Sequence, residues 1–289
     1  MTQGILNVLK PPGMTSHDIV SFVRKAYKLK RVGHAGTLDP AAAGVLPVFL
    51  GQATRLIEYQ ADADKSYRAE LTFGYATDTG DDTGRIIEQA SFKLPELEKI
   101  TDCLSSFQGV IKQIPPMYSA IKVNGQKLYD LARAGITIER ESREVLIHSI
   151  KLVTITDSTL LFDVTCSKGT YIRTLCIDIG QALNIPAVMS FLVRTRVGSF
   201  HLQDAYSLEE ISCSAESILL PQEKAVDHLD CVHVNQADSL AFRNGRSILM
   251  PTSNAKSNLL RIYDDRNIFI GIATAQGQVL TPKKVFHPE

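Results

Sequence analysis

Apolar residues recur at strand and helix spacings along most of the chain. Short apolar or alternating runs bounded by Gly, Pro, Asp or Ser are typical of β-strands. They predict strands over residues 4–9, 45–50, 66–73, 146–155, 160–166 and 193–202. In the run at 66–73, Tyr67 and Ala69 fall on the side opposite Arg68, so one face of this strand is predicted to be buried.

Apolar residues three and four positions apart predict helices between these strands. One helix is expected after Thr15 or Ser16 as its N-terminal cap, with Asp18 in its first turn. Further helices are predicted from Pro95, over about 126–133 up to Gly135, from a cap at Thr170, and over 207–220 with a Ser207/Glu210 capping box. The helix after Thr170 carries a regular apolar face that ends near Asn184.

The connections between these elements indicate the fold class. Asp157-Ser158, between two β-rich runs, predicts a hairpin, and the strands and helices do not alternate as repeated βαβ units. We therefore predict an α/β (α+β) fold with a mixed, mainly antiparallel sheet flanked by helices.

The pattern changes after about Gln222. A short helix over 235–243 precedes strands at 259–263, 268–275 and 279–280, which form a β-rich stretch of the size of a small appended domain. We predict a large domain over 1–225 and a small C-terminal domain over 226–289.

The overall charge restricts the classes of partner. The 289 residues carry 31 Lys and Arg against 31 Asp and Glu, so the formal net charge is zero, which argues against a general binder of polyanions. Five bases nevertheless gather without an acid among them: Arg24, Lys25, Lys28, Lys30 and Arg31. This stretch is either a local basic surface or an ordinary solvated helix end.

Several classes of site and location are not indicated. No apolar run reaches the length of a membrane span and the first residues lack a signal-peptide core, so we expect a cytoplasmic protein. The five cysteines are widely spaced, which predicts reduced thiols and argues against a zinc site. No glycine-rich nucleotide motif occurs. We expect no metal, no nucleotide cofactor and no membrane partner.

The stretch 33–46 carries the candidate chemistry. It begins Gly33-His34-Ala35-Gly36-Thr37-Leu38-Asp39-Pro40, and its glycines and proline predict a shaped loop before the buried strand 45–50. Pro40 restricts Asp39 to extended backbone geometry, which holds the Asp39 carboxylate in one direction. This arrangement suits a catalytic carboxylate, and an ordinary Asp-Pro turn is the alternative.

Three other features bear on function. Arg173 lies in the first turn of the helix predicted after Thr170, where a cation opposes the helix dipole, so a carboxylate or phosphate partner is expected nearby. The proline-rich loop at 113–122 is either a flap over a site or an ordinary surface excursion. The acidic turn at 78–84 lacks the glycine and glutamate positions of a calcium loop.

Four motifs, in order and well separated, resemble the tRNA pseudouridine-55 synthases. They are Gly-His-Ala-Gly-Thr-Leu-Asp-Pro with Ala-Gly-Val-Leu behind it, Lys-Ser-Tyr-Arg at 65–68, Gln-Ile-Pro-Pro-Met-Tyr-Ser-Ala-Ile-Lys and Ser-Lys-Gly-Thr-Tyr-Ile-Arg. The resemblance runs from Lys10 to Gly198, and the C-terminal stretch stands where bacterial members often carry a PUA-like RNA-binding module. In one departure, Val193 follows Leu192 where the family often has arginine, which puts one backbone or phosphate contact in doubt.

The resemblance implies an isomerase that converts the uridine at position 55, in the T arm of tRNA, to pseudouridine on a bisected sheet without a cofactor. Asp39 would be the essential catalytic aspartate, and Arg173 would pair with its carboxylate. The other implied roles are a platform stacked on the flipped-out base (Tyr67), walls of the uracil pocket (Tyr171 and Leu192), supports of the loop (His34 and Lys10), and a T-arm grip in an insertion at about 110–145. We expect a monomer.

The reaction fits these residue types. It breaks the N1–C1′ bond and rejoins the uracil through C5, and an ionised carboxylate supplies a nucleophile or base. Three routes remain open for Asp39: attack on the ring, attack on C1′, or removal of a sugar proton. The alternative function is a non-catalytic structured-RNA-binding or RNA-chaperone protein. A glycoside hydrolase pairing Asp39 with Asp81 or Asp82 has no support from the spacing.

Overall fold

Strands from distant parts of the chain form a nine-stranded sheet within the described residues of the computed structural model, which are 2–119, 121–123, 125–213, 217–251 and 257–287. The main path runs through β1 (Gly4–Lys10), β3 (Ala43–Leu50), β12 (Ala187–Val197), β4 (Lys65–Phe73), β11 (Thr159–Cys166), β10 (Arg143–Ile155) and β7 (Gly109–Gln113). β2 (Val32–His34) pairs with β3, and β13 (Phe200–His201) pairs with β12. The pairing of β12 with β3 is parallel and the other pairings in this sheet are antiparallel, so the predicted mixed, mainly antiparallel sheet is confirmed.

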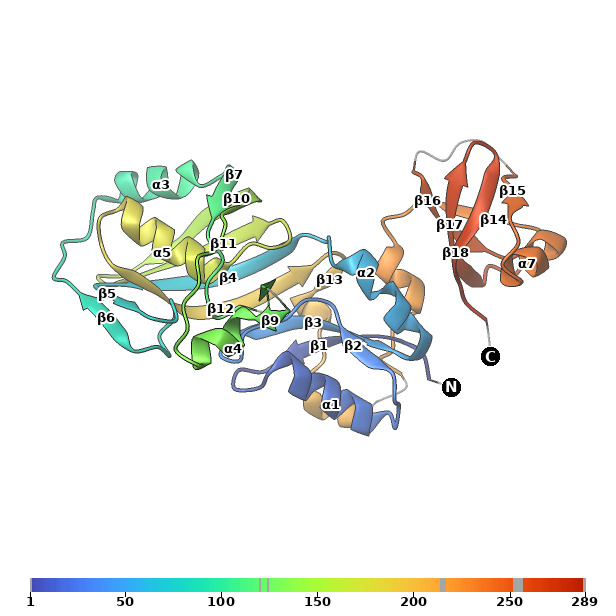
Figure 1. The fold of residues 1–289 in the computed structure, drawn as a ribbon, viewed down its shortest axis with the longest axis horizontal. Helices are drawn as coiled ribbons and strands as arrows, with labels where there is room; N and C mark the ends of the chain where they lie inside the picture. Colours follow the sequence, from blue (N-terminus) through green and yellow to red (C-terminus); the bar gives the residue numbers. More distant parts are fainter. Residues whose placement is uncertain (1, 120, 124, 214–216, 252–256, 288–289) are drawn as a thin grey trace.

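One face of this sheet carries the larger hydrophobic core. Ala69 of β4 pairs with Phe162 of β11 and with Leu192 of β12, and all three side chains are buried. Helices α5 (Ile172–Ala182) and α3 (Leu97–Ser106) contribute Leu175, Ile179, Ile100 and Leu104 to the same cluster. The predicted alternation of β4 and the predicted apolar face of α5 therefore meet in one core (Figure 1).

The first helix forms as its sequence predicts. Thr15 caps α1 (Ser16–Ala26), because the Asp18 N–H donates to the Thr15 hydroxyl while the Asp18 carboxylate accepts from the Thr15 N–H. Ile19 and Val23 then face a second apolar cluster against β1 and β3. This docking sets the turn between β1 and α1 next to the loop that carries Asp39.

The strand predicted at 193–202 is wrong in both of its bounds. β12 begins at Ala187, and it ends at Val197 because Gly198 adopts a positive φ of 54° and turns the chain back. Phe200 then pairs with Val197 as the first residue of β13. The apolar run thus forms two strands of a hairpin, since the glycine permits a tight turn inside it.

Helix boundaries also differ from the prediction. Tyr171, and not Thr170, is the N-cap of α5, because the Thr170 hydroxyl donates to the carbonyl of Ser167. The helix expected from Pro95 begins at Leu97, with Glu96 as its cap. The helix expected over 126–133 is α4 (Leu128–Arg133), since Gln126–Lys127 forms the short strand β9.

The helix predicted over 207–220 is shorter than expected. Its Ser207/Glu210 capping box is present, and α6 covers Leu208–Cys213. Residues 214–216 of the predicted helix lie outside the described residues. Leu220 instead exchanges backbone hydrogen bonds with Ile5 of β1, which holds this end of the segment in an extended form.

A second sheet forms from the C-terminal part of the chain. Its strand order is β14 (Cys231–His233), β16 (Leu259–Tyr263), β17 (Phe269–Gln276), β18 (Val279–Val285) and β15 (Ile248–Leu249). The helix α7 (Gln236–Arg243) begins at the cap Asn235, as predicted. Figure 1 shows this sheet as a separate body beside the larger one, with α2 (Ile57–Gln60) at the junction.

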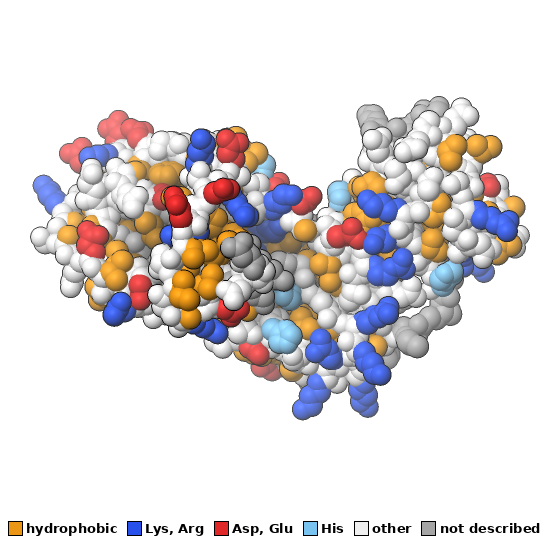
Figure 2. Space-filling view, viewed as in Figure 1, with side chains coloured by type: hydrophobic (Ala, Val, Ile, Leu, Met, Phe, Trp, Pro, Cys, Tyr) orange, Lys and Arg blue, Asp and Glu red, His pale blue; other side chains and the backbone are white. Residues whose placement is uncertain are grey.

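The two bodies share side chains at this junction. One apolar cluster combines Phe49 and Leu56 from the large sheet's side with Phe269 and Phe286 from the small sheet. Figure 2 shows Lys and Arg side chains gathered on the face beside the junction. Among the described residues, none of the helices combines the length and the apolar character needed to cross a bilayer.

Candidate active site

The loop between β2 and β3 is held from the turn that precedes α1. The Leu38 N–H donates to the Ser16 hydroxyl at 2.9 Å, and this hydroxyl donates back to the Leu38 carbonyl at 3.2 Å. The Gly13 N–H donates to the Pro40 carbonyl at 2.8 Å. These bonds hold the residues on both sides of Asp39, so the carboxylate has a defined position before any substrate binds.

Lys10 supports the same loop from beneath. Its ammonium donates to the carbonyls of Pro11 at 3.0 Å, Pro40 at 3.1 Å and Ala42 at 2.6 Å, and the side chain is fully buried. Burial lowers the pKa of Lys10 to about 8, although the nearby Asp39 charge acts in the opposite direction. The structure thus places Lys10 as a hub of three backbone contacts.

Arg194 holds the other side of the loop. Its guanidinium donates to the carbonyls of Val45 at 2.8 Å, Gly36 at 3.1 Å and Thr37 at 3.3 Å, and only 1% of the residue is exposed. The sequence-based reading placed Arg194 on a strand without a role. The available signal was its place in Leu192-Val193-Arg194-Thr195, directly after the Val193 that departs from the family pattern. A buried arginine needs several hydrogen-bond acceptors of this kind.

Arg173 and Asp39 form an ion pair at the centre of the site. The Arg173 Nε lies 2.9 Å from the Asp39 Oδ2, and one terminal nitrogen of Arg173 lies 3.5 Å from the Oδ1. The guanidinium side chain is 5% exposed, whereas the carboxylate side chain is 37% exposed. The guanidinium of the pair is therefore buried, while the carboxylate remains open to a ligand.

The remaining contacts of Arg173 come from two further segments. Its terminal nitrogens donate to the carbonyl of Thr79 at 3.1 Å and to that of Tyr118 at 2.6 Å. Asp81 also lies near, with 4.0 Å between its Oδ2 and the Arg173 Nε. The acidic turn 78–84 and the proline-rich loop 113–122 thus both touch this guanidinium.

Asp81 was considered from the sequence only as a partner in a hydrolase. Its Oδ1 accepts from the hydroxyls of Thr79 at 2.7 Å and Thr83 at 2.6 Å, so its side chain is held in the turn. Asp81 is therefore a second carboxylate next to the Asp39–Arg173 pair. The acid-rich turn was the available signal, but its distance from 173 in the chain concealed the contact.

Tyr67 and Tyr171 lie within electrostatic range of Asp39, and Leu192 lies in the same apolar cluster as Leu38 of the Asp39 loop. Tyr67 on β4 lies across from Arg194 of β12, with which its hydroxyl hydrogen-bonds, and burial raises the pKa of Tyr67. Leu192 is 7% exposed in the core face of β12. Tyr171 receives positional support from Gln113, whose side-chain oxygen accepts the Tyr171 N–H at 3.0 Å, and burial raises the pKa of the Tyr171 phenol.

His34 lies at the end of β2, opposite Val48 of β3, at the start of the loop. It is half-buried, and burial followed by the Arg194 charge lowers the pKa of its imidazole. A neutral ring is therefore expected near pH 7. The contacts recorded in the described residues do not join His34 directly to Asp39.

The segment at about 110–145 leaves the large sheet at β7 and returns at β10. It includes the short pair β8 (Lys122–Val123) and β9, followed by α4. Residues 120 and 124 of this segment lie outside the described residues. Because the Tyr118 carbonyl contacts Arg173, the segment borders the ion pair directly.

Comparisons with known proteins match most of the chain to one family. The family profile described as TruB family pseudouridylate synthase (N terminal domain) matches residues 24–172. Two further profiles match the rest: the tRNA pseudouridylate synthase B C-terminal domain over 173–229, and Pseudouridine synthase II TruB, C-terminal, over 231–286.

Individual relatives cover nearly the whole chain. A tRNA pseudouridine synthase B of Caldanaerobacter subterraneus subsp. tengcongensis is 47% identical over 98% of this chain and 99% of its own length. Another with this name, from Alkaliphilus oremlandii, is 51% identical over 85% of this chain and 82% of its own. A chain from the crystal structure of a Cbf5–Nop10–Gar1 complex is 29% identical, covers 99% of this chain and 85% of its own, and has a TM-score of 0.79. The resemblance noted in the sequence is confirmed, and the chain belongs to the TruB family of pseudouridylate synthases.

Proposed function

We propose that this protein isomerises uridine 55 in the T arm of tRNA to pseudouridine. The Asp39–Arg173 ion pair carries the proposal, because it presents an open carboxylate on a buried guanidinium. Asp39 lies in the matched N-terminal family domain, and Arg173 is the first residue of the matched C-terminal domain. The relatives named tRNA pseudouridine synthase B support tRNA as the substrate class. T-arm specificity rests on the sequence motifs.

The chemistry assigned to Asp39 needs a charged and stationary oxygen. Arg173 favours the ionised carboxylate and aligns it, since an adjacent opposite charge stabilises the anion. Lys10 and Arg194 hold the loop from two sides through backbone carbonyls. The carboxylate acts on a uridine whose N1–C1′ bond breaks and whose uracil rejoins through C5, so that the atoms of the substrate are conserved.

The target nucleotide has to leave its stack to reach this oxygen. Extrusion costs a few kcal/mol, and an aromatic platform contributes roughly 1–3 kcal/mol per stacked base. We assign Tyr67 to this stacking, Tyr171 and Leu192 to the walls of the uracil pocket, and His34 to the support of the loop, as for Lys10. The family resemblance implies these roles, and the effect of the Asp39 charge on the Tyr67 and Tyr171 phenols supports a place near the ion pair for both tyrosines.

The remaining parts of the chain are assigned to RNA binding. We propose that the insertion at about 110–145 grips the T arm, since it borders Arg173. The division into a catalytic part, 1–225, and a PUA-like RNA-binding part, 226–289, follows the two sheets, and the protein is proposed to act as a cytoplasmic monomer. Val193 replaces an arginine at this point of the family motif, and its side chain lies half-buried opposite Arg68.

The test is an assay on unmodified tRNA labelled with tritium at C5 of uridine. We expect tritium release and pseudouridine at position 55 with the wild type, and a loss of at least about 10³-fold in single-turnover rate with Asp39→Asn. tRNA with cytidine at position 55 is the substrate control. Full activity of Asp39→Asn would contradict the proposal and favour the non-catalytic RNA-binding alternative.

A further inference from the structure

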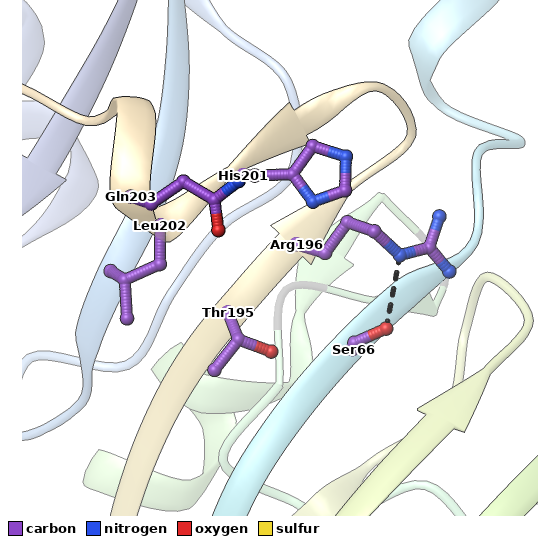
Figure 3. Close-up of a pocket in the computed structure, with 6 residues that line it drawn as sticks. All are labelled: Ser66, Thr195, Arg196, His201, Leu202 and Gln203. Carbon is purple, nitrogen blue, oxygen red and sulfur yellow. Dashed lines mark hydrogen bonds between the residues drawn. The ribbon is translucent and has the colours of Figure 1, made fainter.

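A pocket away from the Asp39–Arg173 ion pair opens between β4, β12 and β13. Its volume is about 460 Å³, and it is lined by Ser66, Thr195, Arg196, His201, Leu202 and Gln203 (Figure 3). None of these side chains takes part in the ion pair or in the loop that carries Asp39. The pocket is therefore a feature separate from the proposed active site.

The pocket lies on the opposite face of the β4–β12 pair from the proposed active site. Tyr67 pairs with Arg194, and Arg194 reaches the Asp39 loop from that face. Ser66 and Arg196, the next pair along the strands, lie across the sheet from them, because neighbouring side chains of a strand point to opposite faces. A ligand here would not compete directly with a base held against Asp39.

An irregularity in β12 builds the pocket. The register with β4 shifts between Arg194 and Arg196, so Thr195 is an extra residue in a bulge. In a regular strand Thr195 and Arg196 would point to opposite faces, but both line the pocket. Bulges of this kind redirect side chains, and here the bulge lets Thr195 and Arg196 line the same pocket.

Arg196 is held in place with one terminal nitrogen available. Its Nε donates to the Ser66 hydroxyl at 3.1 Å, and its Nη1 donates to the Gly198 carbonyl at 3.0 Å. The Ser66 hydroxyl is in turn 2.9 Å from that of Thr165. In the described part of the chain the Nη2 of Arg196 has no recorded partner, so a fixed cationic donor remains for a ligand.

The other polar groups of the pocket are also available. The Thr195 hydroxyl, the His201 ring and the Gln203 amide have no recorded hydrogen bond with another described residue. Their backbone is firmly placed, since His201 pairs with Arg196 and its carbonyl accepts from the Asn7 amide at 2.8 Å. The lining residues include no carboxylate. Polar groups that can donate hydrogen bonds therefore line a pocket that has a positive charge and no negative one.

We propose that this pocket binds a phosphate group. A guanidinium flanked by hydroxyl, imidazole and amide donors matches the oxygens of a phosphate, whose charge strengthens each hydrogen bond. The volume leaves room for the sugar or base of a phosphate ester beside the phosphate itself. The source of the group is either a backbone phosphodiester of bound RNA or a free phosphate ester.

The first experiment uses the wild-type full chain and inorganic phosphate, followed by NMR of the His201 ring protons. We expect a saturable shift of the His201 signals. Arg196→Gln should weaken this binding by about tenfold or more, since it removes the charged partner. Arg68→Gln is the matched control, because it removes an arginine of β4 from an exposed pair with Asp163 of β11, and it should leave phosphate binding unchanged.

A second variant keeps the test decisive if Arg196→Gln does not fold. Thr195→Val removes one donor at constant size and keeps Arg196, and it should weaken phosphate binding by a smaller factor. A His201 signal that does not respond to phosphate, or that responds equally in the folded pocket variants, overturns the proposal. Neither result depends on whether the protein modifies tRNA.

The two sources are separated by adding tRNA. If the pocket holds an RNA phosphodiester, saturating tRNA shifts the His201 signals by itself and blocks the effect of added phosphate. If it holds a free ester, adenosine monophosphate binds more tightly than inorganic phosphate and tRNA leaves that binding intact. Both results support a phosphate site and identify its ligand.

Discussion

At the scale of single residues, the proposed active site depends on the Arg173 guanidinium, whose N–H groups bond to several partners at once. Arg173 bonds to the Asp39 carboxylate and to the carbonyls of Thr79 and Tyr118, with Asp81 at 4.0 Å. These partners come from separate loops, so Arg173 supplies a positive charge to the site and also connects the loops that form it. A lysine would retain the charge but not the planar fork that serves several directions at once.

We therefore expect Arg173→Lys to slow the chemical step more than it weakens RNA binding. The single-turnover rate should fall by about 10²-fold or more, since a misplaced carboxylate loses the alignment that the reaction needs. Rapid-quench measurement of pseudouridine gives the rate, and filter binding gives the affinity for tRNA. Arg68→Lys, in an exposed pair with Asp163, is the control and should retain the wild-type rate. An unchanged rate in Arg173→Lys would show that the fork is dispensable.

Asp81→Asn tests the second anion beside the same guanidinium. The substitution keeps the size of the side chain but removes its charge, so Arg173 should keep its bond to the Thr79 carbonyl and lose one of the two anions beside its guanidinium. We expect a fall of about tenfold in single-turnover rate with little change in tRNA affinity. Asp163→Asn, at an exposed ion pair, should leave the rate unchanged. A larger fall in affinity than in rate would place Asp81 in RNA binding instead.

Lys10 gives a prediction that depends on pH. Its pKa is lowered from 10.5 to about 8 in the folded protein, so between these values the unfolded chain binds the additional proton. The stability of the wild type relative to Lys10→Met should therefore rise as the pH increases from about 8 to 10.5. Urea unfolding of both proteins across this range measures the difference, and a constant or falling difference would contradict the assigned burial.

At the scale of secondary-structure elements, local signals predicted most of what formed. The capping box of α1, the apolar face of α5 and the hairpin between β10 and β11 all follow from a few neighbouring residues. Errors arose where a tertiary contact decided the outcome. Leu220 leaves the predicted helix because Ile5 of β1 offers it backbone partners, and that contact is invisible in a local pattern.

The candidate site shows the same division. The sequence led to Asp39 and Arg173 through a loop motif and a charge at the unfavourable end of a helix, and the structure brings these two residues together. Arg194 and Asp81 were not assigned to this site, since their importance comes from carbonyls and charges supplied by other strands and turns. The sequence did not reveal them because their partners are far away along the chain, and not because of their residue type.

Helix α5 carries a charge that is unfavourable for stability. Burial raises the pKa of Asp178 from 3.8 to about 6, so the group contributes full stability below pH 3.8 and loses it as the pH rises through 6. Asp178→Asn should therefore stabilise the protein near pH 7, by about 1 kcal/mol once solvent around the half-buried side chain is considered. The gain should vanish below pH 4.

Thermal and urea unfolding at pH 4 and pH 7 measure this gain. Asp102→Asn, at an exposed position of α3, removes the same charge and should change the free energy of unfolding by less than about 0.5 kcal/mol. An Asp178→Asn variant that is equally stabilised at both pH values would show that the effect does not arise from the carboxylate charge.

At the scale of the whole molecule, the two sheets are joined by a core that neither builds alone. Phe286 is 1% exposed, and its ring packs 5.4 Å from that of Phe269, both within the cluster that includes Phe49 and Leu56. Arg55 adds a polar bond to the Val285 carbonyl at 2.6 Å and lies over the Phe286 ring. A short C-terminal segment thus sets the position of the second sheet relative to the large sheet and the proposed active site.

Phe286→Ala should show whether the C-terminal sheet contributes to RNA affinity or to the rate of the reaction. The cavity left by the ring should destabilise the junction by about 3–5 kcal/mol, so the small sheet should exchange its amide protons faster while the large sheet remains protected. Leu249→Ala, at a position of β15 that is 69% exposed, is the control and should change neither. If the C-terminal sheet contributes RNA affinity, Phe286→Ala weakens binding of full-length tRNA while single-turnover conversion of the saturated complex stays near the wild-type rate. A fall in that rate with unchanged affinity would instead mean that the junction shapes the loop around Asp39, since Phe49 lies on the strand that this loop enters.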